Sequence, residues 1–252
     1  TSARGVATVL SSDPAIAAQV LGAANSAQHG CAQRVVTLSH AVMVLGFNTV
    51  RNLVLALSLV DTLRRGTGWR PGDQLNFWRN ATACGAVARV LARRLGDPRV
   101  EELFLLGLLH DVGRAMIRGW LPDAADRIED GCAAGLSPLF VEREVLGTDH
   151  AHLGAALLER WKLPPLYVDV VRHHHSPALA EDLRAAAIVN ISDVLSLAVD
   201  LSLDDHERAP RVSREAWALV GLDGNSTREV LRAAFTQLGE ARALIEGARS
   251  VS

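Results

Sequence analysis

The sequence predicts an all-α fold, and three observations lead to that prediction. Aromatic residues are scarce, at 4% of the 252 residues, whereas Ala, Leu and Arg recur along the whole chain. Ala, Leu and Arg are good helix formers, while strands favour aromatic and β-branched residues. Neither a GxGxxG motif nor a P-loop is present, and strand patterns do not alternate with helix patterns.

The first part of the chain carries two short helix patterns. Asp13 followed by Pro14 is typical of an N-cap and first helical turn, because proline needs no amide partner there. Thr37 or Ser39 can open a second helix, which Gly46 closes.

The next patterns predict three longer helices. Thr49 to Leu63 is nearly all apolar, so we expect this helix at the centre of its lobe. The Gly- and Pro-rich segment Arg64–Asp73 is the best candidate linker and a possible hinge. Gln74 to Leu95 and Glu101 to Leu109 follow as helices, separated by the turn Gly96-Asp97-Pro98 and with an interruption expected around Gly113.

Prolines and caps indicate the later helices. Pro122, Ser137-Pro138 and Leu163-Pro164-Pro165 indicate helix starts or breaks. Glu181 to Val199 reads as a long amphipathic helix, and Ser226 with Glu229 has the spacing of a capping box before a terminal helix.

Charge and hydropathy argue against two classes of partner. The net charge of −2 and a pI near 6.5 give no general electrostatic reason to expect nucleic acid or an acidic membrane. The longest apolar runs, Leu53–Leu57 and Leu103–Leu109, are too short to span a bilayer.

Cysteine usage indicates a reducing compartment. Cys31, Cys84 and Cys132 are widely separated and lack CxxC spacing, so we expect buried small hydrophobes, with no disulfide framework. We therefore expect a cytoplasmic location. The chain begins with Thr1 and without Met, which indicates a part of a longer protein.

A His–Asp pair ends the most apolar helix pattern. His110 and Asp111 follow Leu105-Leu106-Gly107-Leu108-Leu109, where a buried carboxylate is costly unless a cation, a metal or hydrogen-bond donors compensate it. Two interpretations stay open from these residues alone: a metal or substrate site, or a structural hydrogen-bonded pair.

Further histidines and carboxylates widen the pattern. They occur in Thr148–His152, in His173-His174-His175 and at Asp193. Neutral imidazoles and carboxylates suit zinc, manganese or iron. Adjacent helical residues point about 100° apart, so three consecutive histidines cannot all face one ion. For His173 we favour a structural role at a helix C-terminus, where the helix dipole favours histidine.

These motifs resemble those of HDOD domains, and the likeness runs in order over nearly the whole chain. The matching segments are Asp13-Pro14, Val20-Leu21, Asn25-Ser26, Ala41 through Leu45-Gly46, Phe77-Trp78-Arg79, Gly107 through Arg114, Leu146 through His150, Leu153-Gly154, Trp161 through Pro164, and His174-His175.

The resemblance implies a helical core of the HD superfamily with an additional N-terminal helical lobe, as found in bacterial signalling proteins. On this basis we expect the N-terminal lobe over residues 1–70, the HD-like core over 71–205, and a C-terminal helical extension over 206–252 that packs on the core.

The resemblance also implies a site for a divalent metal (Mn, Fe or Zn). His110 and Asp111 match the HD pair, and Asp193 matches the late Asp of active HD enzymes. His150, His174 and His175 match the extra histidines of the HD-GYP branch.

Three departures from the active enzymes bear on the chemistry. Asn80 stands at the first-His position, and an amide oxygen is a poor substitute for imidazole toward a transition metal. The Gly-Tyr-Pro triplet is missing, since the one tyrosine is Tyr167. Arg114 stands where active enzymes commonly carry a lysine; its guanidinium can bind phosphate but cannot readily release a proton.

We therefore predict a non-catalytic output or adaptor module with a degenerate HD metal site and signalling proteins or domains as partners, and we assign no catalytic residue. The alternative is a metal-dependent phosphohydrolase acting on a nucleotide or cyclic dinucleotide. A third possibility is a nucleotide sensor without turnover.

Overall fold

The computed structural model describes residues 14–27, 35–199 and 212–249. Within these ranges every regular element is a helix, so the fold is all-α, as predicted. The expected cap at Asp13 and the cysteine Cys31 lie outside the described residues.

The chain divides into two compact units, residues 1–62 and residues 63–252. The predicted division at 70 and 205 stays a prediction.

In the first unit, helix α2 (Pro14–Ala27) packs against α3 (Leu38–Leu45), and α4 (Phe47–Arg64) follows. The Asn25 side-chain amide donates to the carbonyl of Val35 (2.9 Å) and accepts from its amide (2.8 Å), which fixes the chain entering α3. The Thr37 hydroxyl caps α3 and Gly46 ends it, as predicted.

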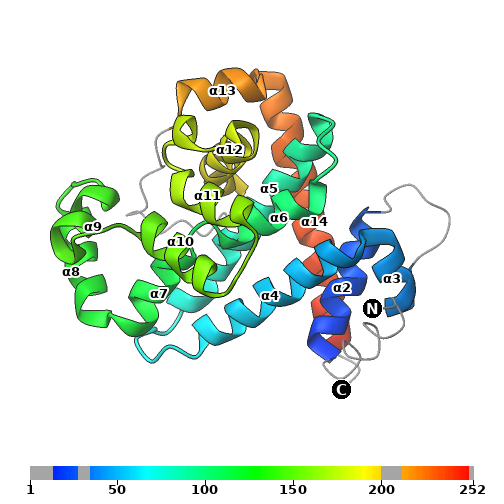
Figure 1. The fold of residues 1–252 in the computed structure, drawn as a ribbon, viewed down its shortest axis with the longest axis horizontal. Coiled ribbons are helices and arrows are strands. Elements are labelled where there is room, and N and C mark those ends of the chain that lie inside the picture. The colour runs from blue at the N-terminus through cyan, green and yellow to red at the C-terminus, as the bar shows by residue number, and fades with distance from the viewer. Residues whose placement is uncertain (1–13, 28–34, 200–211, 250–252) are drawn as a thin grey trace. The chain divides into compact units, whose positions relative to one another are not determined.

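The second unit contains the remaining helices (Figure 1). They are α5 (Asp73–Arg94), α6 (Val100–Leu109), α7 (Val112–Trp120), α8 (Pro122–Ala133), α9 (Pro138–Leu146), α10 (His150–Arg160), α11 (Pro165–His173), the 3₁₀ turn η1 (Pro177–Leu179), α12 (Leu183–Val199), α13 (Arg214–Val220) and α14 (Gly224–Arg249).

Helix α5 lies at the centre of this unit. It packs against α6, α12 and α14, while α10 packs against α7 and α11. Helix α12 is apolar nearly all round and has a run of fully buried residues, 185–192. A helix of this kind belongs inside a protein core, so any polar group that it carries must find a partner there.

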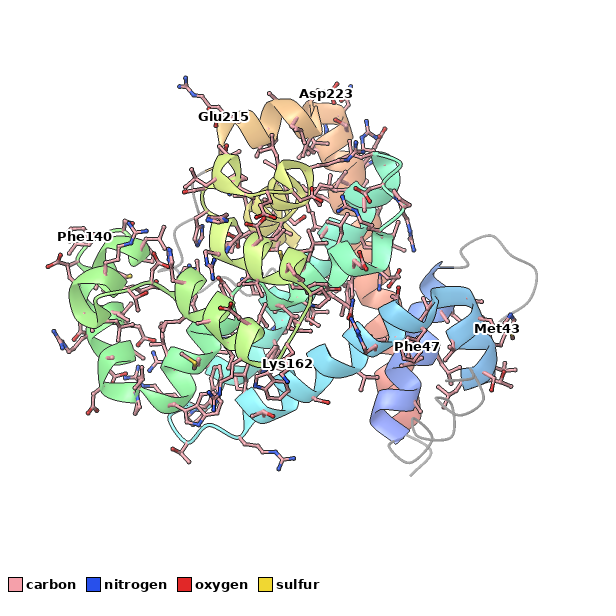
Figure 2. All side chains as sticks on the ribbon, in the orientation of Figure 1. Met43, Phe47, Phe140, Lys162, Glu215 and Asp223 are labelled. Atoms are coloured by element: carbon pink, nitrogen blue, oxygen red, sulfur yellow. The ribbon has the colours of Figure 1, made fainter. Side chains whose placement is uncertain are left out.

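Prolines start α8, α9 and α11 at Pro122, Pro138 and Pro165, as predicted from the sequence. Between α10 and α11, Lys162 adopts a left-handed conformation with φ 56° and redirects the chain (Figure 2).

Three sequence-based expectations need correction. The helix predicted as amphipathic over residues 181–199 begins at Leu183 and is apolar nearly all round. The apolar helix α6 is interrupted at His110-Asp111, before Gly113, so the polar pair itself forms the junction between α6 and α7. The capping box of α14 is formed by Asp223 and Ser226, because the Asp223 carboxylate accepts from the Ser226 amide (2.7 Å) and the Ser226 hydroxyl accepts from the Asp223 amide (2.8 Å). Glu229 instead forms an ion pair with Arg94 at 3.2 Å.

Among the described residues, the longest apolar stretches of helix fall short of what crossing a bilayer requires.

Candidate metal centre

The six predicted ligand residues all lie in the second unit and converge in its interior. His110 and Asp111 form the junction of α6 and α7, and His150 is the first residue of α10. His174 and His175 follow the last residue of α11, and Asp193 lies in α12. Five of the six are buried and His175 is partly buried.

Two close helix contacts bring these segments together. At Gly113, a Cβ atom would lie 1.9 Å from the carbonyl oxygen of His150 and 2.9 Å from the amide of Gly154. At Gly107, it would lie 2.8 Å from the Cα atom of Gly85 in α5. Because no real side chain tolerates such distances, glycine at these positions lets α7 meet α10 and α6 meet α5 through their backbones.

The Asp111 carboxylate lies at the centre of the cluster. Its Oδ1 atom lies 3.1 Å from His150 Nε2 and 3.6 Å from His174 Nε2. Its Oδ2 atom lies 3.3 Å from Arg114 Nη1 and 3.5 Å from His110 Nε2. The two oxygens therefore face different groups.

Three histidines are oriented through their Nδ1 atoms. His110 donates to the carbonyl of Gly107 and His174 to that of Val171, each at 2.7 Å. His150 Nδ1 lies 2.7 Å from Glu142 Oε2, whose carboxylate also accepts from the His150 backbone amide at 2.8 Å. This arrangement leaves each Nε2 atom directed at the cluster, as in metal-binding histidines whose other ring nitrogen is held by a carbonyl or carboxylate.

Polar atoms at the centre lack hydrogen bonds. In the part of the chain that the structure describes, neither Asp111 Oδ1 nor His174 Nε2 has a hydrogen-bond partner, although both are buried. His150 Nε2 and His175 Nε2 lie 2.9 Å apart. Buried acceptors without donors are rare and costly, and a divalent cation among these atoms would satisfy them together. The donor set, imidazole nitrogens and carboxylate oxygens, fits zinc, manganese or iron.

The electrostatics of the cluster favour an ionised Asp111 and neutral imidazoles at His174 and His175. Burial opposes ionisation of Asp111, but Arg114, His110 and His150 hold the pKa of its carboxyl well below the usual range. Burial also lowers the pKa of the His174 and His175 imidazoles, with neighbouring histidines adding to the effect. Burial opposes charge on His150 and His110 as well, but Asp111 and Glu142 raise the pKa of the His150 imidazole, and Cys84 and Asp111 raise that of His110. A metal binds the ionised carboxylate and neutral imidazoles, so an ion would compete with protons at these two histidines.

A second group of side chains shares Asp111. His110 Nε2 lies 3.2 Å from Asp193 Oδ1, and His110, Asp111 and Asp193 present ligand atoms within 4.8 Å of one another. The Asn80 amide oxygen accepts the Ser196 hydroxyl at 2.9 Å, and that hydroxyl also lies 2.7 Å from the Asp193 carbonyl.

Two histidines near the predicted ligands, His152 and His173, contact carboxylates outside the cluster. His173 Nδ1 lies 2.9 Å from Asp169, one turn earlier in α11, so its imidazole has a structural partner. His152 Nδ1 contacts Asp149, the N-cap of α10, at 2.7 Å. The predicted phosphate contact of Arg114 stays a prediction; its guanidinium contacts Asp111.

Several residues around the cluster were not identified from the sequence. Glu142 orients His150, and Cys84 is fully buried beside His110, where burial raises the pKa of its thiol. The buried Asn190 amide donates to the carbonyl of His174 (2.8 Å) and accepts from the amide of Ser213 (3.1 Å). Their partners lie on other elements, so no spacing in the sequence indicates them.

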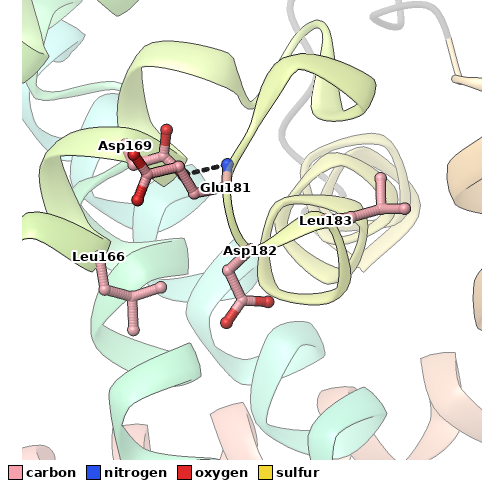
Figure 3. Close-up of a pocket in the computed structure, with 5 residues that line it drawn as sticks. All are labelled: Leu166, Asp169, Glu181, Asp182 and Leu183. Atoms are coloured by element: carbon pink, nitrogen blue, oxygen red, sulfur yellow. Dashed lines mark hydrogen bonds between the residues drawn. The ribbon is translucent and has the colours of Figure 1, made fainter.

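An open pocket of about 350 Å³ lies apart from these residues, lined by Leu166, Asp169, Glu181, Asp182 and Leu183 (Figure 3). Two of its three carboxylates have structural partners: Asp169 accepts from the Glu181 backbone amide at 2.9 Å and contacts His173, and Asp182 pairs with Arg99. The buried cluster is therefore the stronger candidate site.

Comparisons with known proteins match most of the chain to one family. The family model of the HDOD domain matches residues 1–177. An uncharacterized protein of Treponema pallidum is 26% identical over 173 residues, which are 68% of this chain and 33% of that protein. The chain thus spans about a third of the length of this relative.

Two solved structures are similar over 94% of this chain. A candidate phosphohydrolase of Shewanella amazonensis is 31% identical, with a TM-score of 0.69 and 86% of that chain covered. A candidate signal transduction protein of Marinobacter aquaeolei is 25% identical, with a TM-score of 0.67 and 54% of that chain covered. The fold is thus that of HDOD proteins and HD-type phosphohydrolases.

Proposed function

Since the chain belongs to the HDOD family, we propose that it is a bacterial signal-transduction output or adaptor module that binds signalling proteins or domains and does not hydrolyse phosphate esters. The similarity to a candidate signal transduction protein supports this class of function.

One observation carries the proposal: the amide of Asn80, which the HDOD resemblance aligns with the first histidine of active enzymes, is already hydrogen-bonded. Its oxygen accepts the Ser196 hydroxyl at 2.9 Å. A catalytic metal site needs protein ligands together with an open position for water, and the loss of an imidazole weakens the group formed by His110 and Asp193.

Arg114 supports the same conclusion. Its guanidinium lies 3.3 Å from Asp111 Oδ2, so a permanent positive charge already neutralises the oxygen that a second ion would use. Arginine also cannot serve as a proton donor in a hydrolytic step.

A hydrolysis assay tests the proposal. The chain is incubated with Mn²⁺, Fe²⁺ or Zn²⁺ and with a nucleoside triphosphate or a cyclic dinucleotide. The variant Asp111→Asn and the control His173→Gln are assayed in parallel. We expect no product that depends on Asp111. Turnover that disappears in Asp111→Asn and persists in His173→Gln would overturn the proposal.

The second candidate function is a metal-dependent phosphohydrolase. The buried groups of His and Asp ligands favour it, as does the 31% identity to a candidate phosphohydrolase. In that case His110, Asp111, Asp193 and the further histidines would hold metal that activates water, and Arg114 would contact the phosphate. Equilibrium binding of a nucleotide without product would instead identify a sensor.

A further inference from the structure

We propose that the chain binds one metal ion in a closed site formed by Asp111 Oδ1, His150, His174 and His175, and that this ion stabilises the fold. The inference deepens the proposed function and rests on it. A chain that does not hydrolyse phosphate esters needs no open position for water at its metal, and a closed site leaves none. The group formed by His110 and Asp193 then holds no ion.

Three of the six distances among the four ligand atoms are close to those of a tetrahedral site. Zinc–ligand bonds of about 2.0–2.1 Å place the ligands of a tetrahedral site about 3.3–3.4 Å apart. The Nε2 atoms of His150 and His175 lie 2.9 Å apart, and Asp111 Oδ1 lies 3.1 Å from His150 Nε2 and 3.6 Å from His174 Nε2. One ligand atom from each of the four residues lies within 4.8 Å of the other three. An ion at their centre would draw the remaining pairs to about 3.4 Å, the separation in a tetrahedral site.

Two of the buried atoms that lack hydrogen bonds belong to this set. Among the described residues, Asp111 Oδ1 and His174 Nε2 are buried and have no hydrogen-bond partner. Asp111 Oδ2, on the other side of the carboxylate, contacts Arg114 at 3.3 Å. The carboxylate thus leaves one oxygen for a cation and pairs the other with a guanidinium, which favours one ion over two.

The second group is incomplete by comparison. His110, Asp111 and Asp193 supply three side chains, and Asp111 contributes to them the oxygen that Arg114 contacts. The Asn80 amide, at the position of a fourth ligand, is hydrogen-bonded to Ser196. Imidazole at position 80 would have favoured an ion here, whereas an amide does not.

Four protein ligands and no open position are typical of structural zinc sites. Here the ligands come from the junction of α6 and α7, from the start of α10 and from the segment after α11. An ion bound to all three segments would fix them against one another, and it would stabilise the folded chain because the unfolded chain has no such site.

The test uses the whole chain, freed of metal and titrated with Zn²⁺. Elemental mass spectrometry gives the number of ions per chain, X-ray absorption gives the coordination, and thermal unfolding gives the stability. We expect one Zn²⁺ per chain, four nitrogen or oxygen neighbours that include imidazoles, and a higher unfolding temperature with the ion.

Three variants locate the ion. His175→Gln should weaken Zn²⁺ binding by at least about tenfold, since even loss of a partner behind a ligand costs about 10–100-fold. Asp193→Asn and the neighbouring control His173→Gln should retain one tight ion. Circular dichroism of each variant checks that its helices are intact.

Three results would overturn the inference: two ions per chain, no tight ion, or one ion that is lost in Asp193→Asn and retained in His175→Gln. Hydrolysis by a chain with one four-coordinate ion would instead contradict only the proposed lack of catalysis. If His175→Gln fails to fold, the number of ions per chain and the coordination of the ion in the unaltered chain still test the inference.

Discussion

Glu142 shows how much of the site depends on a residue that is not a predicted ligand. Its buried carboxylate binds both the backbone amide and the imidazole Nδ1 of His150. A carboxylate in this position fixes the tautomer of the imidazole and makes its Nε2 atom a better ligand.

Replacing Glu142 by Gln should therefore weaken metal binding without removing a ligand. We expect the affinity for Zn²⁺ to fall by about 10–100-fold, because the amide lacks the charge and offers one acceptor oxygen where the carboxylate offers two. Competition with a chromogenic chelator measures the Zn²⁺ affinity of each variant. Glu144→Gln, at an exposed position in the same helix, is the matched control. Equal affinities for the two variants would contradict this role.

Asp149 caps α10 at the point where His150 enters the cluster. Its carboxylate accepts from the amide of His152 (3.0 Å) and from Arg143 Nη2 (2.7 Å). Burial works against the charge, but hydrogen bonds from His152 and Arg143 lower the pKa of the Asp149 carboxyl to about 2.

Asp149→Ala should destabilise the chain in a pH-dependent way. We expect a loss of about 0.5–2 kcal/mol near neutral pH, the usual contribution of an N-cap. A folded-state pKa below the unfolded value of about 3.9 means that the charge contributes above about pH 4. That contribution disappears as the pH falls toward 2.

Chemical denaturation between pH 7 and pH 2.5 measures the difference between the two chains. Ser137→Ala is the control, because Ser137 occupies the N-cap of α9 without a side-chain cap hydrogen bond, and its effect should stay within about 0.5 kcal/mol. If the loss in free energy of unfolding for Asp149→Ala is constant over the whole pH range, the ionised carboxylate does not contribute to stability.

At the scale of helices, the contact between α7 and α10 is the tightest constraint on the site. Helix α7 begins directly after Asp111 and α10 begins with His150, so their separation sets the distance between two ligands. Gly113 is the point of closest approach, since an added Cβ would lie 1.9 Å from the His150 carbonyl oxygen.

Gly113→Ala should force the two helices apart. We expect a loss of about 1–3 kcal/mol or more in the free energy of unfolding, typical of overpacking, together with weaker Zn²⁺ binding. Gly224→Ala, in the same unit, adds a methyl group with nothing within 4 Å and should change the stability by less than about 0.5 kcal/mol. Similar stabilities for the two variants, measured by denaturant unfolding, would rule out a tight contact at Gly113.

For the molecule as a whole, the local signals of the sequence predicted the helices well. Pro122, Pro138 and Pro165 start helices and Gly46 ends one, because their preferences depend on the backbone at a single position. The capping box of α14 was misplaced by three residues because Asp223 and Ser226 satisfy the same spacing rule as Ser226 and Glu229.

The cluster was only partly predictable. The six predicted ligands were identified as polar residues in apolar surroundings and by their likeness to HDOD motifs; they are His110, Asp111, His150, His174, His175 and Asp193. Glu142, Asn190 and Ser196 were not identified, because each contacts a residue outside its own helix and the packing of the helices decides which one. The unequal roles of the two Asp111 oxygens likewise depend on the fold, which brings Arg114 to one and histidines to the other.

The order of the ligands along the chain has a consequence for biosynthesis. Asp111, His150, His174 and His175 all precede α12, which carries Asp193 and the run of buried residues 185–192. A ribosome adds about 5–20 residues per second, so the nascent chain carries the four-ligand set before α12, with its run of buried residues, has been translated. Metal captured at that stage would order the partly made chain, and cells starved of the metal would release more of it misfolded.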